Sequence, residues 1–184
     1  SDVLFYTQQK VAAPNTPPAE LLRGSRSHMR TFPVDGVPRD AVLFGADLSS
    51  AVVIDQDDIP AIEVSPVSPF AIGIVQHGVQ REISLYVVRL TELRGAATPW
   101  RKLAGPERGI VGFDLRGEWI YLVTNENAPR YQVARWSLND KRPYALADAE
   151  VLVPESTRVV RGVSVAKDAL YVQQMDAGYS TLLR

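Results

Sequence analysis

The sequence predicts an all-β fold, and three features of the 184-residue chain support this prediction. Short runs rich in β-branched and aromatic residues recur along the chain, each bounded by turn-forming residues. No segment shows a convincing helical period, and the best helical candidate, residues 18–23, is stopped after one or two turns by Gly24. The third feature is a repeat of these runs at a spacing of about 50 residues.

Five alternating or apolar runs predict strands, at residues 3–6, 41–44, 84–88, 119–123 and 170–172. Residues 11–27 are rich in Pro, Ser, Gly and Asn, and we expect them to form a long loop.

The polar stretch Asn-Glu-Asn-Ala-Pro, which follows the run 119–123, is expected to form a hairpin turn. Asn125 and Asn127 tolerate left-handed backbone geometry, and Pro129 fixes φ, so these residue types suit a turn. Tyr131 is then expected to begin the next strand. The stretch therefore has an architectural role and not a catalytic one.

The repeat becomes visible when "FAIGIVQ", "EWIYLVT" and "DALYVQQ" are aligned on Ile72, Tyr121 and Tyr171. The next strands, "ISLYVVRL", "YQVARWSL" and "YSTLLR", recur at nearly the same offset. Units open with "IPAIEVSP", "GIVGFDLR" and "VRGVSVAKD", and two of them close with "PWRKLAG" and "AEVLVPE". Four strand positions therefore repeat together.

A four-stranded antiparallel sheet that repeats at this interval is typical of a β-propeller blade. One blade has two apolar faces and cannot cover both by itself, so neighbouring blades stack face to face. A β-sandwich with irregularly spaced strands is the alternative. The joint repetition of four strand positions favours the propeller.

The repeat divides residues 1–184 into two whole blades and two partial ones. The whole blades are predicted at residues 58–105 and 109–154. A partial blade at residues 1–47, which includes the long loop 11–27, supplies a second, third and fourth strand, and residues 159–184 supply a first, second and third. Because closed propellers need about 4–8 blades, we expect the chain to be a segment of a larger ring.

The composition excludes several classes of function. A net charge of −1 gives no basic surface of the kind that attracts nucleic acid, and no apolar run approaches the ~20 residues that cross a bilayer. We therefore expect neither a nucleic-acid partner nor a membrane partner. The chain has no cysteine, which excludes disulfides and cysteine metal sites. No signal peptide is visible, and the compartment, cytoplasmic or periplasmic, stays open.

The sequence contains no convincing catalytic or metal site. The nearest approach to a Gly-x-Ser-x-Gly nucleophile motif is Gly-Val-Ser-Val-Ala around Ser164, which lies in a strand pattern with no helix after it. The two histidines, His28 and His77, are too few for a zinc site without cysteine. His77 is a conceivable general base, but a turn histidine at a blade rim is the better interpretation.

The stretch Asp-Gln-Asp-Asp-Ile-Pro is the other possible ligand site, because it places Asp55, Asp57 and Asp58 in one loop. A calcium loop needs about six oxygen ligands and usually a glycine turn and a terminal glutamate. The stretch lacks both, so a solvated loop is favoured. We expect no metal, no cofactor and no catalytic residue in this chain.

The segments "WIYLVTNENAPRYQVARWSL", "EVLVPES" and "VVRGVSVAKDALYVQQMDAGYSTLLR" resemble the N-terminal propeller of the prolyl oligopeptidase family. The resemblance extends to "VSPFAIGIVQHGVQREISLYV", "VLFYTQ" and "VLFGAD", and it is weakest in residues 11–30. It implies a seven-bladed propeller paired with an α/β-hydrolase domain that carries a Ser-Asp-His triad. In that family the propeller covers the active site, so that only short peptides enter and are cut after proline.

The resemblance also implies candidates for the wall of the substrate chamber. Phe5 matches an aromatic residue of the family that lines the substrate pocket, and Tyr6 is its competitor, because a slip of one residue would exchange their faces. A packed blade aromatic is an equally good interpretation of Phe5. An arginine of the family that contacts the peptide backbone has no counterpart, since Val75 occupies its position. Gln76 and His77 are the nearest polar substitutes.

Three functions follow from these observations. The first is a non-catalytic lid and substrate filter of a prolyl oligopeptidase-type serine peptidase, with the α/β-hydrolase domain and short proline-containing peptides as partners. The second is a stand-alone interaction module that binds through blade rims or open strand edges, which includes self-association. The third, hydrolysis by this chain alone, has no supporting residue constellation.

Overall fold

The computed structural model describes residues 2–9, 13–21, 23–34, 36–48 and 52–184. The described residues form fourteen β-strands and no α-helix, so the all-β prediction is confirmed. Each of the five runs expected as strands lies within a strand. The helical elements are single 3₁₀ turns at η1 (Pro18–Glu20), η2 (Leu90–Glu92), η3 (Pro106–Arg108) and η4 (Leu146–Asp148).

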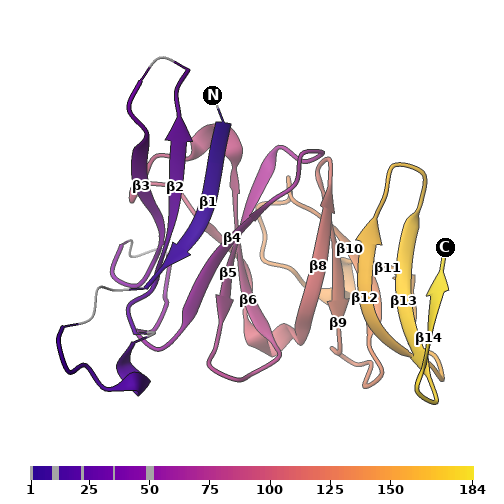
Figure 1. Ribbon diagram of the computed structural model, residues 1–184. Coiled ribbons are helices and arrows are strands. Elements are labelled where there is room, and N and C mark those ends of the chain that lie inside the picture. The colour runs from indigo at the N-terminus through magenta and orange to yellow at the C-terminus, as the bar shows by residue number, and fades with distance from the viewer. Residues whose placement is uncertain (1, 10–12, 22, 35, 49–51) are drawn as a thin grey trace. The chain divides into compact units, whose positions relative to one another are not determined.

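The strands form four sheets, two of three strands and two of four (Figure 1). The first sheet contains β1 (Asp2–Gln8), β2 (Arg26–Phe32) and β3 (Arg39–Gly45). The second contains β4 (Ile59–Val64), β5 (Phe70–Gln76), β6 (Ile83–Arg89) and β7 (Arg101–Ala104). The third contains β8 (Ile110–Arg116), β9 (Trp119–Thr124), β10 (Gln132–Ser137) and β11 (Glu150–Val153). The fourth contains β12 (Val159–Val165), β13 (Leu170–Asp176) and β14 (Tyr179–Leu183).

Within every sheet, strands that follow one another along the chain are hydrogen-bonded neighbours. This meander of three or four antiparallel strands is the blade pattern that the sequence repeat predicts. The third and fourth sheets also share a β-bulge at matching places, between Ile110 and Gly112 in β8 and between Val160 and Gly162 in β12. The repeat therefore extends to local irregularities of the strands.

The residues divide into two compact units. The first unit comprises Ser1–Val64, Ala71–Gln80 and Leu85–Lys102. The second comprises Ser65–Phe70, Arg81–Ser84 and Leu103–Arg184. Each unit contains a hydrophobic core between two packed sheets.

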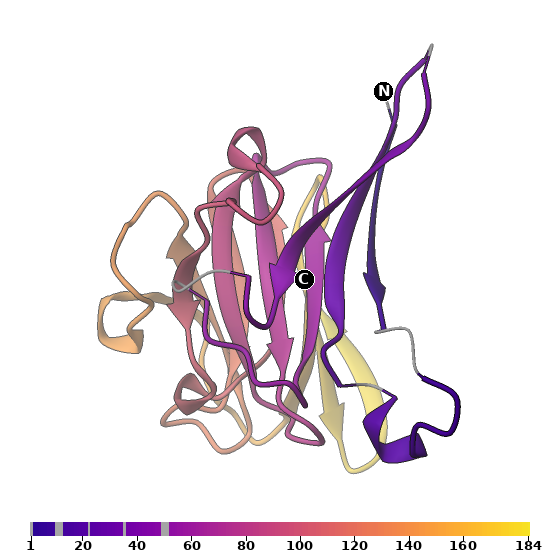
Figure 2. The same cartoon turned by 90° about the vertical axis from the view of Figure 1, so that its left-hand side faces the viewer.

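The core of the first unit lies where the β1–β3 sheet packs against β4 and its neighbours. Its centre is aromatic: the rings of Phe44 and Trp100 lie 5.0 Å apart, and the Trp100 indole N–H donates to the Leu43 carbonyl at 2.9 Å. Gly73 is required beside this cluster, because a Cβ there would lie 2.9 Å from the Phe44 ring. Figure 2 shows the β2–β3 hairpin continuing past the N-terminal end of β1.

The core of the second unit joins the third and fourth sheets. Val123 and Val133 from β9 and β10 pack against Val160 and Val172 from β12 and β13. Polar contacts add to this packing, because the Asp114 carboxylate accepts a hydrogen bond of 2.6 Å from the Val165 amide. The Arg116 guanidinium donates to the carbonyls of Ala166 and Lys167 at 2.7 and 3.1 Å.

Two expectations about boundaries were wrong. The loop expected at residues 11–27 ends earlier, because Arg26 and Ser27 already belong to β2. Ser27 is buried there opposite Thr7, and the two hydroxyls lie 3.2 Å apart, so a polar residue is accommodated inside the strand.

Tyr131 does not begin a strand, since β10 starts at Gln132. It has a φ of 66° and closes the turn, with its amide donating to the Ala128 carbonyl at 2.7 Å. Asn127 takes the left-handed geometry expected of it, with a φ of 55°. The turn is therefore one residue longer than the sequence suggested.

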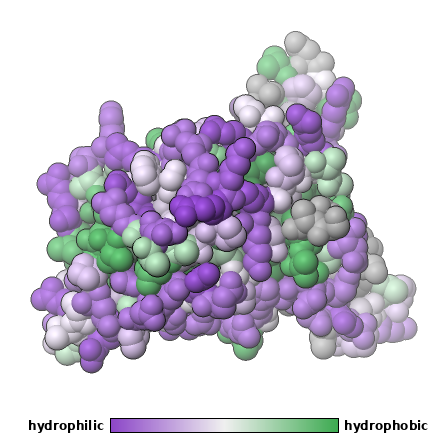
Figure 3. All heavy atoms as spheres, turned by 180° about the vertical axis from the view of Figure 1, so that it is seen from behind, coloured by the Kyte–Doolittle hydropathy of each residue, from purple (hydrophilic) through white to green (hydrophobic). Residues whose placement is uncertain are grey.

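Hydrophilic residues cover most of the face drawn in Figure 3, and hydrophobic residues form separate patches between them. No helix in the described part of the chain has the length and apolar character needed to cross a membrane.

Candidate substrate-facing site

One face of the β1–β3 sheet carries four polar and aromatic side chains that contact one another. Tyr6 lies opposite His28 across β1 and β2, and the two rings stack with centroids 5.2 Å apart. The Tyr6 hydroxyl donates to Asp40 Oδ1 at 2.9 Å. Arg30 donates to both oxygens of Asp40, at 2.8 and 2.6 Å. We name Tyr6, His28, Arg30 and Asp40 the Tyr6 cluster.

The pKa values in the Tyr6 cluster shift in directions that its contacts explain. The two hydrogen bonds from Arg30 hold the pKa of Asp40 below its ordinary value. The hydrogen bond to Asp40 raises the pKa of Tyr6. Partial burial of the His28 ring disfavours the charged form and lowers its pKa. At neutral pH the cluster therefore combines a neutral aromatic pair with an Arg–Asp ion pair.

We expect His28 to titrate with a pKa below 6.5, since desolvation dominates its environment. Because burial penalises the charged ring in the folded state, His28 leaves stability unaffected above its unfolded-state pKa and lowers stability as the pH falls from there through the lower folded-state pKa. Replacing Asp40 by asparagine removes a nearby negative charge and should lower the pKa of His28 further. An NMR titration of the ring protons, with His77→Gln to assign the two histidines, measures both effects. A His28 pKa that rises in the Asp40→Asn protein would contradict this electrostatic account.

Phe5 points to the opposite face of β1 from Tyr6, because successive side chains of a strand alternate. It lies opposite Met29 of β2 and packs against the core of the first unit. Both side chains are half-buried, but Phe5 packs against the core whereas Tyr6 stacks on His28 on the opposite face of the strand. A chamber role for either residue stays a prediction.

Gln76 and His77 lie together where β5 runs into the turn before β6. The Gln76 side-chain amide donates to the Gln80 carbonyl across this turn. His77 Nδ1 lies 3.0 Å from Asp58 Oδ1, and the other Asp58 oxygen accepts a hydrogen bond of 3.0 Å from the Asp55 amide. The Asp58 side chain is only 9% exposed, so a buried carboxylate orients the His77 ring.

The acidic loop around Asp55 is held by contacts within the first unit. Arg23 Nε lies 2.7 Å from Asp57 Oδ1, and the Gln56 amide donates to Asp47 at 2.6 Å. Among the described residues, no group of three or more His, Cys, Asp or Glu side chains is placed to hold a metal ion. The contacts that do exist give these carboxylates a structural role.

Ser164 and Val75 occupy ordinary strand positions. Ser164 lies in the middle of β12 opposite Tyr171, in a strand that leads into β13 and not into a helix. Val75 is fully buried in the core of the first unit, so the position aligned with the family's arginine does not face solvent.

An open hollow of about 390 Å³ lies next to the Tyr6 cluster and shares His28 with it. It is lined by Gln8, Gln9, Gly24, Arg26, His28, Asp47 and Gln56. Neither the hollow nor the contacts of His28, Arg30 and Asp40 were predicted from the sequence. One feature of the sequence could have indicated this cluster. Side chains alternate between the two faces along residues 26–30, which places Arg26, His28 and Arg30 on one face of the strand.

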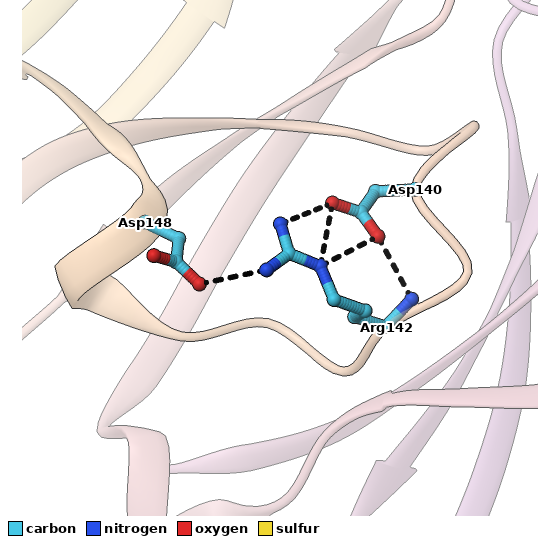
Figure 4. A network of polar contacts seen from close by, with 3 residues as sticks. All are labelled: Asp140, Arg142 and Asp148. Carbon is cyan, nitrogen blue, oxygen red and sulfur yellow. Dashed lines mark hydrogen bonds and ion pairs between the residues drawn. The ribbon is translucent and has the colours of Figure 1, made fainter.

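Two arginines in loops of the second unit form ion pairs with nearby carboxylates. Arg142, in the loop between β10 and β11, contacts Asp140 at 2.8 Å and Asp148 at 3.1 Å (Figure 4). Arg108, at the end of η3, lies 3.1 Å from Glu126 in the turn after β9. These pairs hold the loops in place.

A comparison with protein families matches residues 70–183 to the prolyl oligopeptidase N-terminal beta-propeller domain. No curated protein matches the chain. Among solved structures, one from an analysis of two prolyl endopeptidases and of inter-domain dynamics in their catalysis and specificity has a TM-score of 0.72 at 18% identity. The match covers 97% of this chain and 24% of that protein's chain.

Two further structures show the same similarity of fold. Prolyl oligopeptidase B from Galerina marginata has a TM-score of 0.72 at 15% identity, with 97% of this chain and 23% of that chain covered. Oligopeptidase B from Leishmania major has a TM-score of 0.66 at 15% identity, with 98% and 22% covered. The chain thus spans about a quarter of the length of these proteins. Because the family match includes more than half of its residues, the chain belongs to the family of prolyl oligopeptidase N-terminal β-propeller domains.

Proposed function

We propose that this chain is a non-catalytic part of the propeller of a prolyl oligopeptidase-type serine peptidase. In this role it forms part of a lid and filter above a chamber that admits short proline-containing peptides. The supporting observation is the family match over residues 70–183, on sheets that have the blade meander. The nucleophile would be supplied by a separate α/β-hydrolase domain.

The proposal includes that this chain itself supplies no catalytic residue. Ser164 is a mid-strand residue of β12, whereas a hydrolase nucleophile needs a sharp turn that exposes its Oγ beside a general base. His77 Nδ1 lies 3.0 Å from Asp58, and this contact orients the ring. The contribution to catalysis would then be exclusion and positioning of substrate.

The Tyr6 cluster is the surface best suited to contact a peptide in such a chamber. Its stacked Tyr6 and His28 rings offer apolar area for a proline ring, and Arg30 and Asp40 offer donors and acceptors for a peptide backbone. Gln76 and His77 would supply further hydrogen bonds, with Phe5 supporting the strand from its packed face.

We expect the purified chain to show no turnover of a chromogenic Gly-Pro amide, because it lacks an activated nucleophile. The rate should equal that of the buffer over a range of pH from 6 to about 9. A release of chromophore that is abolished by Ser164→Ala would show that the chain is catalytic and would overturn the lid proposal.

Peptide recognition can be tested on the same chain by NMR. We expect a Gly-Pro-containing tetrapeptide to shift the amide signals of Tyr6 and His28 more than a matched Gly-Ala peptide does. Tyr6→Ala should raise the dissociation constant of the Gly-Pro peptide at least about threefold. A Phe5 variant should be tested separately, because the Phe5 side chain packs against the core of the first unit. Equal responses to both peptides would remove the chamber role of the Tyr6 cluster.

A second candidate function is a protein-interaction module. The observation that favours it is that, among the described strands, the two outer strands of each sheet pair with one neighbour only. Strand edges of this kind can add a strand from another chain.

A further inference from the structure

The hollow beside the Tyr6 cluster is lined by polar side chains of opposite charge. Arg26 begins β2 and Asp47 closely follows β3, so a cation and an anion reach the hollow from neighbouring strands. Gln8 of β1 lies opposite Arg26, and Gln56 comes from the loop between β3 and β4. The hollow of about 390 Å³ therefore offers a guanidinium, a carboxylate and amide groups to a ligand.

The Arg26 side chain lies over the neighbouring strand. Arg26 pairs with Gly45 of β3, and a Cβ at position 45 would lie 2.9 Å from Arg26 Cγ, so the glycine makes room for the arginine stem. Burial lowers the pKa of His28 and the positive charge of Arg26 lowers it further, which indicates that the guanidinium lies near the ring. Among the described residues, no carboxylate forms an ion pair with Arg26, although Asp47 lines the same hollow.

Asp47 is held in place by its backbone and by a neighbouring amide. Its φ is 61°, a left-handed geometry that aspartate tolerates better than most residues. The Gln56 side-chain amide donates to Asp47 Oδ2 at 2.6 Å, and the Gln56 carbonyl accepts a hydrogen bond of 2.7 Å from the Gly24 amide. This contact uses Oδ2, so Asp47 Oδ1 can accept a hydrogen bond from a ligand.

We propose that this hollow binds a small α-amino carboxylate, with the ligand carboxylate on Arg26 and the ligand N–H group on Asp47. A free amino acid and the C-terminal residue of a short peptide both supply this chemistry. The proposal does not depend on the lid function, because it requires neither proline nor a hydrolase domain.

The charges and the size of the hollow favour this class of ligand. The planar guanidinium of an arginine matches a carboxylate through two parallel hydrogen bonds, and an ionised aspartate only accepts them. With His28 neutral, the charges of Arg26 and Asp47 balance, which disfavours a multiply charged anion such as phosphate. A volume of about 390 Å³ is at the lower end of the ~300–1,000 Å³ that is usual for ligand pockets, and it suits one or two residues.

The test is an NMR titration of the whole chain with N-acetyl-alanine and with N-acetyl-alanine amide, which lacks the carboxylate. Because Arg26 and Asp47 are exposed, we expect a dissociation constant of about 1–10 mM for the acid and no saturable binding of the amide. The bound carboxylate should also raise the pKa of His28, since it counters the positive charge of Arg26. Free alanine distinguishes the two sources: tighter binding than N-acetyl-alanine indicates a free amino acid, and weaker binding indicates a peptide C-terminus.

Variants of Arg26 connect this binding to the hollow. Arg26→Gln should raise the dissociation constant of N-acetyl-alanine at least about fivefold, and Arg26→Lys should have a smaller effect because it keeps the charge. In the free protein, Arg26→Gln should raise the pKa of His28, which checks the position of the guanidinium without a ligand. Arg39→Gln is the matched control, because Arg39 is an exposed arginine at the other end of β3, opposite Thr31.

Asp47→Asn tests the second contact and should weaken the binding of free alanine more than that of N-acetyl-alanine, because it removes the partner of the ammonium group. The dispersion of the amide spectrum shows whether each variant is folded. Equal responses to N-acetyl-alanine and its amide, or an affinity that Arg26→Gln leaves unchanged, overturn the proposal. Inorganic phosphate that binds as tightly as N-acetyl-alanine also overturns it, since the hollow would then be a general anion site.

Discussion

Replacing Trp100 by alanine is expected to lower the free energy of unfolding by about 3–5 kcal/mol. The Trp100 side chain is almost fully buried, and its ring packs against Phe44 in the core of the first unit. The replacement leaves a large cavity and also removes the hydrogen bond to the Leu43 carbonyl. A loss of this size is a substantial part of the ~5–15 kcal/mol that stabilises a typical domain.

Urea denaturation followed by far-UV circular dichroism measures this loss. Trp119→Ala is the matched control, because Trp119 is 39% exposed and its removal should cost less than about 1.5 kcal/mol. Trp100→Phe should fall between the two, since it keeps part of the apolar volume but loses the rest of the indole ring and its N–H donor. Equal effects of Trp100→Ala and Trp119→Ala would show that Trp100 is not central to the core.

The role of Trp100 illustrates how one sheet depends on the next. Trp100 directly precedes β7, whereas its hydrogen-bond partner Leu43 belongs to β3 of another sheet. Phe44 of β3 likewise contacts Tyr86 of β6, with ring centroids 5.4 Å apart. The sheets of the first unit therefore share one aromatic core, which is the physical requirement for blades that cannot bury both faces alone.

The strands were predictable because the information that defines them is local. Alternating and apolar runs such as residues 119–123 indicate both that a strand is present and where it lies in the repeat. Boundaries were less predictable where side chains found tertiary partners. Ser27 reads as a loop residue in the sequence, but Thr7 on the neighbouring strand satisfies its hydroxyl. Tyr131 reads as a strand residue, but its backbone is left-handed.

The candidate site was only partly predictable because it depends on register. The sequence places Phe5 and Tyr6 on opposite faces of a strand but cannot say which face is packed. That choice is made by the pairing of Tyr6 with His28, which come from strands separated by a long loop. The contact between His77 and Asp58 has the same origin, since it joins two loops at the ends of β4 and β5.

The second large effect is expected from replacing Val133 by aspartate. Val133 is completely buried in the core between the third and fourth sheets, beside Val123, Val160 and Val172. A carboxyl group there must remain neutral or enter the core charged, and burial raises such a pKa by about 3–5 units. At about 1.4 kcal/mol per unit, the free energy of unfolding at pH 7 should fall by about 4 kcal/mol or more. Chemical denaturation at pH 7 measures the loss.

The pH dependence separates desolvation of the carboxyl group from a simple packing defect. Since the pKa of the new carboxyl group is higher in the folded state than in the unfolded state, its penalty grows as the pH rises and shrinks as the pH falls towards about 4. The difference in stability between the Val133→Asp protein and the unmodified chain should therefore be smaller by about 3 kcal/mol at pH 4 than at pH 7. Val151→Asp, on the same sheet at a position that is 41% exposed, should show little change at either pH. A pH-independent loss at Val133 would mean that water reaches the carboxyl group between the two sheets, and face-to-face burial would no longer explain how the second unit is held together.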